Sequence, residues 1–301
     1  MRVGIIGAGS IGLLFAAYIS RVSEVTIYTR TVEQAAEINK FGILLKISEK
    51  EDTLSLIKAL PIKEWKGDEE LTIIAVKQYQ LPVIVEMVNK LALVPKNILF
   101  LQNGMGHLKL LETIPFTNIF VGSVEHGALK ENPSTVAHNG EAATKVAVFR
   151  GDPAILLEFI HSAPPEFPLV FKENYFSMLI SKLVVNAVIN PLTATLQVEN
   201  GELIKNPFYF QVLKNLFSEI CSILHLDNPN AHLQQIIGIC KNTSTNRSSM
   251  LKDLEASRMT EVDAILGFIL DEAKNKGITA PLVENLYYLI KGKEIIKGEY
   301  A

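Results

Sequence analysis

The chain has 301 residues, a length that predicts two domains, each large enough to bury a hydrophobic core of its own. Hydrophobic residues make up 48% of the sequence and charged residues 20%, proportions that exclude a disordered or fibrous protein. The 29 basic and 32 acidic side chains leave a net charge of −3, which argues against nucleic acid as the main partner.

The cysteines and the long apolar segments indicate the cellular compartment of the protein. Cys221 and Cys240 show no metal-ligand spacing, and no grouping of histidine, cysteine and carboxylate residues predicts a metal site. The apolar stretch 3–19 superficially resembles a signal peptide, but its four glycines and the lack of a convincing cleavage site argue against export. No later run approaches the length of a membrane span. We therefore expect a reduced, cytoplasmic protein with no membrane partner.

The first half of the sequence alternates short apolar strands with helical segments. The predicted strands are Arg2–Ile6, Glu24–Thr29, Leu71–Val76 and Asn97–Leu101, and the predicted helices are Ile11–Ser20 and Val32–Asn39. Continuous apolar runs suit parallel strands that are covered on both faces. Between them, residues 42–60 predict an antiparallel or irregular insert. The alternation predicts right-handed βαβ units and a doubly wound, Rossmann-type α/β sheet.

The second half is helical almost throughout, and the change follows a cluster of prolines near residue 165. Within it, Thr260-Glu261-Val262-Asp263 predicts a capping box that opens a helix running to about Lys276, where Gly277 ends it. We therefore predict an α/β domain over residues 1–165 and an all-α domain over residues 166–301.

A glycine-rich loop opens the first predicted helix and fits the pattern G-x-G-x-x-G. Its residues are Gly7, Ala8, Gly9, Ser10, Ile11 and Gly12. Because the loop follows a predicted strand and precedes a helix, a dinucleotide site is favoured over a tight turn without a ligand. In that site Gly7 permits the turn, Gly9 lets the backbone approach a pyrophosphate, and Gly12 allows close packing of helix on strand. The helix N-terminus attracts the phosphates.

The end of the second predicted strand decides between NAD and NADP. An NAD enzyme typically places Asp or Glu there, whereas this sequence reads Ile27-Tyr28-Thr29-Arg30-Thr31. The guanidinium of Arg30 can bind a 2′-phosphate bidentately, although an ordinary solvated arginine is the alternative. NADP is therefore the predicted cofactor.

Further candidate loops follow other strands of the predicted sheet. Lys77 ends one apolar strand, Asn103 begins a glycine-rich turn after the next, and residues 124–128 are a fainter candidate. Each could be only a solvated residue or a turn, but together they fall on the rim where open α/β sheets bind ligands. His126 and His138 are interpreted as structural.

One predicted helix of the second half carries a polar stripe. Lys182, Asn186 and Asn190 recur at i, i+4 and i+8 within the strongly apolar stretch that begins at Phe176, so they share one face. Burying a lysine and two amides without partners is costly, which favours a polar site or a ligand over an ordinary solvent-facing stripe. Pro191 predicts a kink or a helix end.

Polar motifs of the second half complete a pattern along the chain. They are Lys182–Ala194, Asn200-Gly201, Asn246–Met250 and Thr260–Asp263. Together with the glycine loop, Lys77, Gln102–Gly104 and His126–Ala128, they resemble the ketopantoate reductase (2-dehydropantoate 2-reductase) family over almost the whole chain. Many dehydrogenases share the glycine loop, whereas the combination of the second-half motifs is much more specific.

The resemblance implies NADPH-dependent reduction of 2-dehydropantoate to (R)-pantoate, on the route to pantothenate and coenzyme A. It implies Lys182 as the general acid and a small 2-oxoacid as the substrate. We expect the protein to be a monomer or a homodimer. The implied substrate-binding residues are Asn103, Asn186, Asn190, Asn200 and Ser249. The implied cofactor-binding residues are those of the glycine loop with Arg30, Lys77, Asn103, Ala128 and Glu261.

Two stretches depart from the family pattern. Ile180 stands where the family usually has tryptophan, and the strand 136–143 has lost glycines. Three alternatives stay open: a related 2-oxoacid or 2-oxoamide reductase, a hydroxyacid or polyol dehydrogenase working in the oxidative direction, and a non-catalytic NADP-binding regulator. The regulator leaves the polar stripe unexplained.

Overall fold

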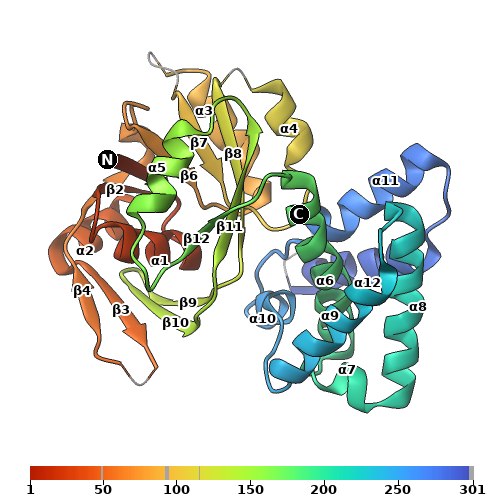
Figure 1. The fold of residues 1–301 in the computed structure, drawn as a ribbon. Coiled ribbons are helices and arrows are strands. Elements are labelled where there is room, and N and C mark those ends of the chain that lie inside the picture. Colours follow the sequence, from red (N-terminus) through yellow and green to blue (C-terminus); the bar gives the residue numbers. More distant parts are fainter. Residues whose placement is uncertain (49, 92–94, 115, 298–301) are drawn as a thin grey trace. The chain divides into compact units, whose positions relative to one another are not determined.

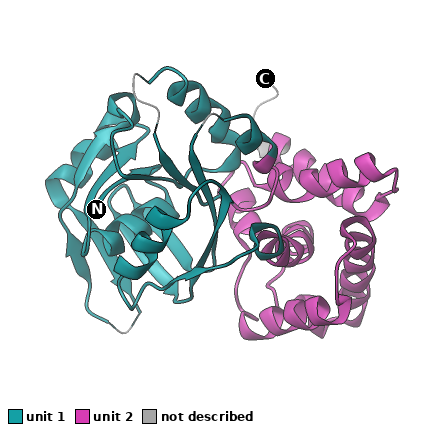
Figure 2. Cartoon of the chain, turned by 45° about the horizontal axis from the view of Figure 1, so that its top comes forward, with its two compact units in different colours: residues 1–102, 109–178 teal, residues 103–108, 179–301 magenta. Residues whose placement is uncertain are grey.

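The computed structural model describes residues 1–48, 50–91, 95–114 and 116–297. The chain divides into two compact units, which Figure 2 colours separately. Unit 1 contains residues 1–102 and 109–178, and unit 2 contains residues 103–108 and 179–301. The sequence predicted the domain boundary near residue 165. The boundary between the two units lies instead at residue 178, inside a long helix, and residues 103–108 of the first half belong to unit 2.

Unit 1 is built on an eight-stranded sheet in the order β12-β11-β8-β7-β6-β1-β2-β5 (Figure 1). The strands are β1 (Arg2–Ile6), β2 (Glu24–Thr29), β5 (Lys58–Pro61), β6 (Leu71–Ile74), β7 (Asn97–Phe100), β8 (Asn118–Val124), β11 (Thr144–Arg150) and β12 (Leu169–Phe171). The strands from β5 to β8 in this order pair in parallel, and β11 runs antiparallel to β8. The chain passes from β1 to β2 on one side and later to β6 on the other, so the predicted doubly wound, Rossmann-type sheet is confirmed.

The strand register brings several loops to one edge of this sheet. Ile6 pairs with Tyr28 on one side and with Ile74 on the other, and Ile74 pairs with Phe100. The four strands therefore end level with one another. The loops that follow β1, β2, β6 and β7 start at the same carboxyl edge, where doubly wound sheets bind ligands.

A second, four-stranded sheet lies in the order β4-β3-β10-β9. Its strands are β3 (Ile43–Ile47), β4 (Thr53–Ser55), β9 (Gly127–Asn132) and β10 (Thr135–Gly140). The antiparallel pair β3–β4 confirms the predicted insert within residues 42–60. The same stretch also supplies β5, a parallel edge strand beside β2, which the sequence analysis missed.

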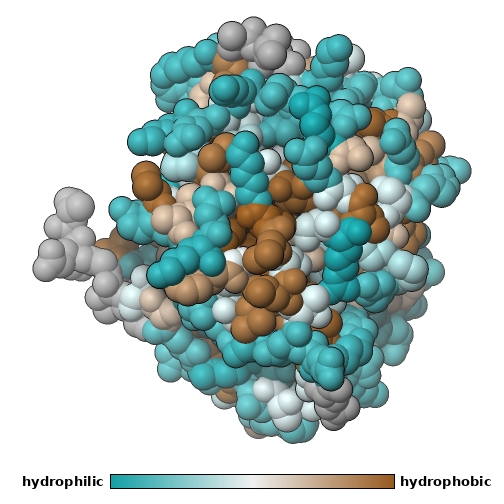
Figure 3. All heavy atoms as spheres, turned by 90° about the vertical axis from the view of Figure 1, so that its left-hand side faces the viewer, coloured by the Kyte–Doolittle hydropathy of each residue, from teal (hydrophilic) through white to brown (hydrophobic). Residues whose placement is uncertain are grey.

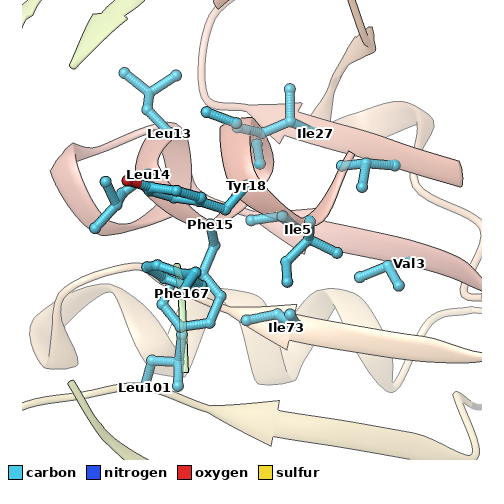
Figure 4. Packing of buried hydrophobic residues seen from close by; sticks show 14 of the residues in the cluster. Val3, Ile5, Leu13, Leu14, Phe15, Tyr18, Ile27, Ile73, Leu101 and Phe167 are labelled. Atoms are coloured by element: carbon cyan, nitrogen blue, oxygen red, sulfur yellow. The ribbon is translucent and has the colours of Figure 1, made fainter. Parts of the chain in front are cut away.

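The helix α1 (Ser10–Ile19) forms the centre of the unit 1 core. Every residue from Gly12 to Ile19 is buried, because α1 contacts β1 and β2 of the large sheet and β3, β9 and β10 of the small one. Figure 4 shows its side chains among those of Val3, Ile5 and Phe167. The apolar stretch 3–19 that superficially resembles a signal peptide thus forms most of β1, the glycine loop and the core helix α1, which lies between two sheets.

The remaining helices of the first half are short. They are α2 (Val32–Phe41), α3 (Leu81–Val88), α4 (Leu108–Thr113) and α5 (Ala154–Ser162). Thr31 caps α2 by accepting a hydrogen bond from the backbone N–H of Gln34. The first turn of α2 is thereby fixed directly after Arg30, at the end of β2.

Some large apolar side chains remain on the surface. Phe41, Leu54 and Leu56 are more than half exposed at the end of α2 and around β4. Figure 3 shows a face on which hydrophobic side chains gather among hydrophilic ones. The expected monomer or homodimer stays a prediction.

Unit 2 is helical. Its elements are α6 (Tyr175–Leu196, from residue 179), α7 (Glu202–Lys205), α8 (Pro207–Leu224), α9 (Pro229–Asn242), α10 (Ser249–Glu255), a π-helical turn (Asp263–Gly267), α11 (Phe268–Lys276) and α12 (Pro281–Lys297). The predicted end of α11 at Gly277 is confirmed, because this glycine adopts a left-handed conformation with φ +65°.

The long helix α6 continues through Pro191 to Leu196, so a helix end at this proline was a wrong expectation. The hydroxyl of Thr193 donates to the carbonyls of Ile189 (2.8 Å) and Asn190 (3.1 Å), and buried apolar neighbours hold this turn in place. By length and composition α6 could cross a membrane, but 72% of its most apolar window is buried inside the protein, as in a core helix.

Candidate functional site

The glycine loop has the geometry of a dinucleotide cradle. Gly7 has φ +104°, a conformation that favours glycine, and a Cβ on Gly12 would lie 1.7 Å from the carbonyl oxygen of Gly7. Among the described residues, a Cβ on Gly9 would meet nothing within 4 Å, and no side-chain hydrogen bond caps the N-terminus of α1 there. The loop thus leaves open backbone and helical N–H groups for a phosphate, which fits a bound dinucleotide.

The neighbouring predicted residues follow strands at the same edge. Arg30 is exposed after β2, and Lys77 is half-buried after β6. The side chain of Gln102 donates to the carbonyl oxygens of Ile74 (3.0 Å) and Val76 (2.8 Å), so it ties the end of β7 to the loop that carries Lys77. The structure therefore brings Arg30 and Lys77 to the edge that holds the glycine loop.

In the candidate segment at residues 124–128, His126 is a core residue, and the role of Ala128 toward a cofactor stays a prediction. Ala128 lies in β9 and packs against the unit 1 core. His126 and His138 are buried and bonded to each other at 3.0 Å, and His138 also bonds the hydroxyl of Tyr18 at 2.9 Å. Burial and the neighbouring His138 lower the pKa of His126 to about 4. These contacts give both histidines a place in the core, as the sequence indicated.

Unit 2 gathers a lysine, an amide and a carboxylate. The ammonium of Lys182, on α6, donates to Asn103 Oδ1 at 2.7 Å, and Asn103 Nδ2 donates to Glu261 Oε2 at 2.9 Å. Because the ammonium can only donate and the carboxylate accepts, the orientation of the amide follows from its partners. Asn103 therefore links a cation to an anion through one planar group.

A close backbone contact holds Asn103 in this place. Gly104 has φ +75°, and a Cβ there would lie 2.2 Å from the carbonyl oxygen of Ala264. The same oxygen accepts a hydrogen bond from the N–H of Met105 at 3.2 Å. Ala264 belongs to the π-helical turn, a rare feature that is frequent at functional sites. The glycine turn after Asn103 is thus seated on the turn that follows Glu261.

The predicted capping box at Thr260–Asp263 is wrong. The N–H and the hydroxyl of Thr260 both donate to Glu294 of α12, at 2.8 and 2.7 Å. The carboxylate that accepts from the N–H of Thr260 is therefore that of Glu294 and not, as a capping box requires, that of Asp263. Asp263 instead accepts from the hydroxyl of Tyr287 at 2.7 Å. The side chain of Glu261 accepts from Asn103 Nδ2.

The polar stripe on α6 is present as predicted, with apolar neighbours buried on both sides. Lys182 and Asn186 are half-buried, and Asn190 is 8% exposed. One turn farther on, the hydroxyl groups of Thr193 and Ser248 are hydrogen-bonded at 2.8 Å, and Ser248 caps α10. The start of α10, where Ser249 is exposed, is therefore fixed to the same helix.

Asn200 holds the loop that leads to Ser249. Its Nδ2 donates to Thr243 Oγ1 at 2.9 Å, and its backbone N–H donates to the carbonyl of Asn246 at 3.0 Å. Its Oδ1 is buried and has no hydrogen-bond partner within the described residues. The structure thus gives Asn200 a place in a loop contact within unit 2, and its role toward substrate stays a prediction.

Two residues at the glycine loop escaped the sequence analysis. Gln34 Nε2 and Lys130 Nζ both donate to the carbonyl oxygen of Ala8, at 2.9 and 3.1 Å. Gln34 follows Thr31 at the spacing of a capping box, so the sequence indicates only a local role for it at the start of a helix. Lys130 lies in β9, two residues after Ala128. The contacts depend on strand pairing that single-sequence patterns do not reveal.

Because His107, in the segment 103–108, is buried, we predict that the protein loses stability at acidic pH. His107 is 2% exposed, neither ring nitrogen has a hydrogen-bond partner in the described part of the chain, and burial lowers its pKa from 6.5 to about 4. Between those values the unfolded chain binds a proton that the folded form does not, so stability present at neutral pH is lost as the pH falls. We expect the free energy of unfolding to fall by about 3 kcal/mol across this window.

Denaturant titrations at several pH values measure this loss. His107→Leu should flatten the pH dependence of the free energy of unfolding, while the same change at exposed His161 controls for the loss of a histidine. An unchanged slope in His107→Leu would show that another group is responsible.

Two family models match the chain. The model described as ketopantoate reductase PanE/ApbA matches residues 3–151, and the model for the C-terminal part of ketopantoate reductase PanE/ApbA matches residues 174–294. Together they cover nearly all of both units.

Individual proteins are also similar along the full length. A 2-dehydropantoate 2-reductase of Bacillus subtilis (strain 168) is 41% identical over 299 residues, which is 98% of this chain and 98% of that protein. A crystal structure of the probable 2-dehydropantoate 2-reductase panE from Bacillus subtilis superposes with a TM-score of 0.88 at 40% identity, covering 97% of this chain and 100% of that one. A D-mandelate dehydrogenase with NADH and anilino(oxo)acetate also gives 0.88, covering 98% of both chains, but at 22% identity it shows the fold alone.

Proposed function

The chain belongs to the ketopantoate reductase family, and from this premise we propose that it reduces 2-dehydropantoate to (R)-pantoate with NADPH. The observation that carries the proposal is the linked group of Lys182, Asn103 and Glu261, which supplies a positioned proton donor. We place this step on the route to pantothenate and coenzyme A, in the cytoplasm, where free thiols such as those of Cys221 and Cys240 persist.

The residues of unit 1 fit the cofactor. The glycine loop and the N-terminus of α1 would hold the diphosphate, and Arg30 would bind the 2′-phosphate. Lys77 and Ala128 complete the proposed cofactor-binding set on the first-half side. When bound, NADPH supplies the hydride that reduces the ketone carbon of the substrate.

Lys182 would act as the general acid. An oxygen that becomes an alkoxide needs a proton and a nearby positive charge, and an ammonium provides both. The bond to Asn103 Oδ1 fixes the direction of Lys182 Nζ on α6, and Glu261 fixes Asn103 from its other side. The donor is thus held before the substrate arrives, which removes an ordering step from the reaction.

The remaining polar residues of unit 2 would orient the substrate. Asn186 and Asn190 continue the face of α6 that carries Lys182, and Ser249 stands exposed at the start of α10, which Thr193 and Ser248 tie to this helix. Amide and hydroxyl groups suit the carboxylate and hydroxyl of a small 2-oxoacid. Asn200 would act through the loop that it holds.

The test of the proposed function is NADPH oxidation with 2-dehydropantoate, followed at the absorbance of the reduced nicotinamide. A panel of other 2-oxoacids distinguishes this activity from that of a related reductase with another substrate. The proposal requires 2-dehydropantoate to give the highest kcat/KM of the panel. A higher value for another 2-oxoacid would reassign the substrate and keep the reaction class.

Arg30 predicts the choice of nicotinamide cofactor. Arg30→Asp should raise the Kd of NADPH by about 10–100-fold, because a charge-assisted contact to the 2′-phosphate is replaced by repulsion, and should spare NADH. Fluorescence titration with both cofactors measures the two constants. Lys63→Asp, the same charge reversal at an exposed residue after β5, is the control. If the ratio of the two Kd values stays at that of the wild type, Arg30 does not bind the 2′-phosphate.

A further inference from the structure

The side chain of Lys130 is directed at the glycine loop by two hydrogen bonds from one residue. Its backbone N–H donates to Ser10 Oγ at 3.0 Å, and its ammonium donates to the carbonyl oxygen of Ala8 at 3.1 Å. Both acceptors belong to the loop formed by residues 7–12. The strand β9 therefore lies along this loop and places a cation against it.

The first turn of α2 meets the same point. Gln34 Nε2 donates to the carbonyl oxygen of Ala8 at 2.9 Å and to that of Pro133 at 2.8 Å. Since Gln34 Nε2 and Lys130 Nζ bond one oxygen, they lie at most about 6 Å apart. Gln34 is in the turn capped by Thr31, the residue after Arg30, so the end of β2, the glycine loop and β9 converge.

The ammonium of Lys130 is held where its charge is unfavourable. Burial and then the positive charge of Arg30 lower the pKa of Lys130, and only the charge of Glu37 acts in the opposite direction. Lys130 forms no ion pair with a carboxylate within the described residues, whereas Lys46 on β3 of the same sheet bonds Glu131 at 2.8 Å. Two nearby cations with so little compensation suit an anion that carries two charges.

We propose that Lys130 binds the 2′-phosphate of NADPH together with Arg30, an inference that rests on the proposed cofactor. The half-buried ammonium would exchange the backbone oxygen of Ala8 for phosphate oxygens, which are stronger acceptors for a cation. With NADH, a neutral hydroxyl stands in this position and leaves both cations without a counter-charge. Lys130 therefore adds to the discrimination between the two cofactors.

Calorimetric titration of Lys130→Met tests this assignment with ligands that differ only in the 2′-phosphate. The pairs are adenosine 2′,5′-bisphosphate against AMP and NADPH against NADH. We expect the Kd of the bisphosphate and of NADPH to rise by about 10–100-fold, and those of AMP and NADH to change less than about twofold. Lys130→Arg should retain the preference, and Lys46→Met, which removes the same charge from β3 of the same sheet, should bind all four ligands as the wild type does.

Two results would overturn the assignment. Equal weakening of all four ligands would place Lys130 at the 5′-phosphate, and wild-type constants throughout would make it a structural residue. Thermal unfolding of each variant shows whether the fold is kept, and Lys130→Gln, which also removes the charge, carries the test if the methionine variant unfolds. If the wild-type protein binds NADH as tightly as NADPH, the proposed cofactor is wrong. This result distinguishes failure of the NADPH proposal from failure of the Lys130 assignment.

Discussion

Replacing Lys182 by alanine should lower kcat for 2-dehydropantoate by about 10²–10⁴-fold, the usual effect of one positioned general acid. The loss follows from the removal of both the proton donor and the charge that stabilises the developing alkoxide. NADPH binding should be kept, because the proposed cofactor residues of unit 1 are unchanged. Steady-state rates at saturating NADPH and a fluorescence titration of the cofactor measure the two effects separately.

Lys205→Ala is the matched control for this variant. Lys205 lies in unit 2 on α7, is paired with Glu202 at 3.3 Å and is mostly exposed. Its removal should leave kcat at the wild-type value. A Lys182→Ala enzyme with near-normal kcat would remove Lys182 as the acid, whatever its hydrogen bond to Asn103.

Gly104→Ala should reduce kcat by about 10²-fold without altering any proposed catalytic side chain. The new Cβ would stand 2.2 Å from the carbonyl oxygen of Ala264, which is backbone, and the residue would have to keep φ +75°. The turn must therefore shift, and Asn103 with it, so that Lys182 and Glu261 lose their common partner. The strain should also lower the free energy of unfolding by about 1–3 kcal/mol.

Gly238→Ala tests whether any glycine-to-alanine change in unit 2 has this effect. Gly238 lies inside α9, and a Cβ there would meet no atom of the described part of the chain within 4 Å. Alanine favours the helix, so this variant should be as active as the wild type and slightly more stable. Rates and denaturant titrations of both variants give the comparison. Wild-type kcat in Gly104→Ala would show that the position of Asn103 does not depend on the turn.

Local patterns in the sequence predicted the parts of the candidate site that depend on spacing alone. The glycine loop follows a strand and opens a helix, and the stripe of Lys182, Asn186 and Asn190 needs only helical periodicity. Glu261 shows the limit. Thr260–Asp263 fits a capping box, but Glu294 lies in another helix and no local window can show that it bonds Thr260.

Lys130 and Asn103 were harder to place for the same reason. Lys130 reaches the glycine loop because β9 pairs within a sheet assembled from segments distant in sequence. Asn103 lies three residues after the end of β7 in unit 1, yet its turn belongs to unit 2, where Gly104 contacts Ala264. Each depends on a backbone contact with a segment remote in sequence, which propensity and periodicity do not encode.

The segment 103–108 has a consequence for the modularity of the chain. Unit 2 is not a continuous stretch of sequence. Its residues 103–108 are preceded and followed in the chain by residues of unit 1, but they group with the helices of residues 179–301. A gene fragment that encodes only residues 179–301 would lack Asn103, and Ala264 would lose the N–H of Met105. If recombination replaced residues 179–301 by those of a relative, the π-helical turn of the relative would meet the glycine turn of this chain. The two segments must therefore change together, although more than 150 residues separate Asn103 from Glu261.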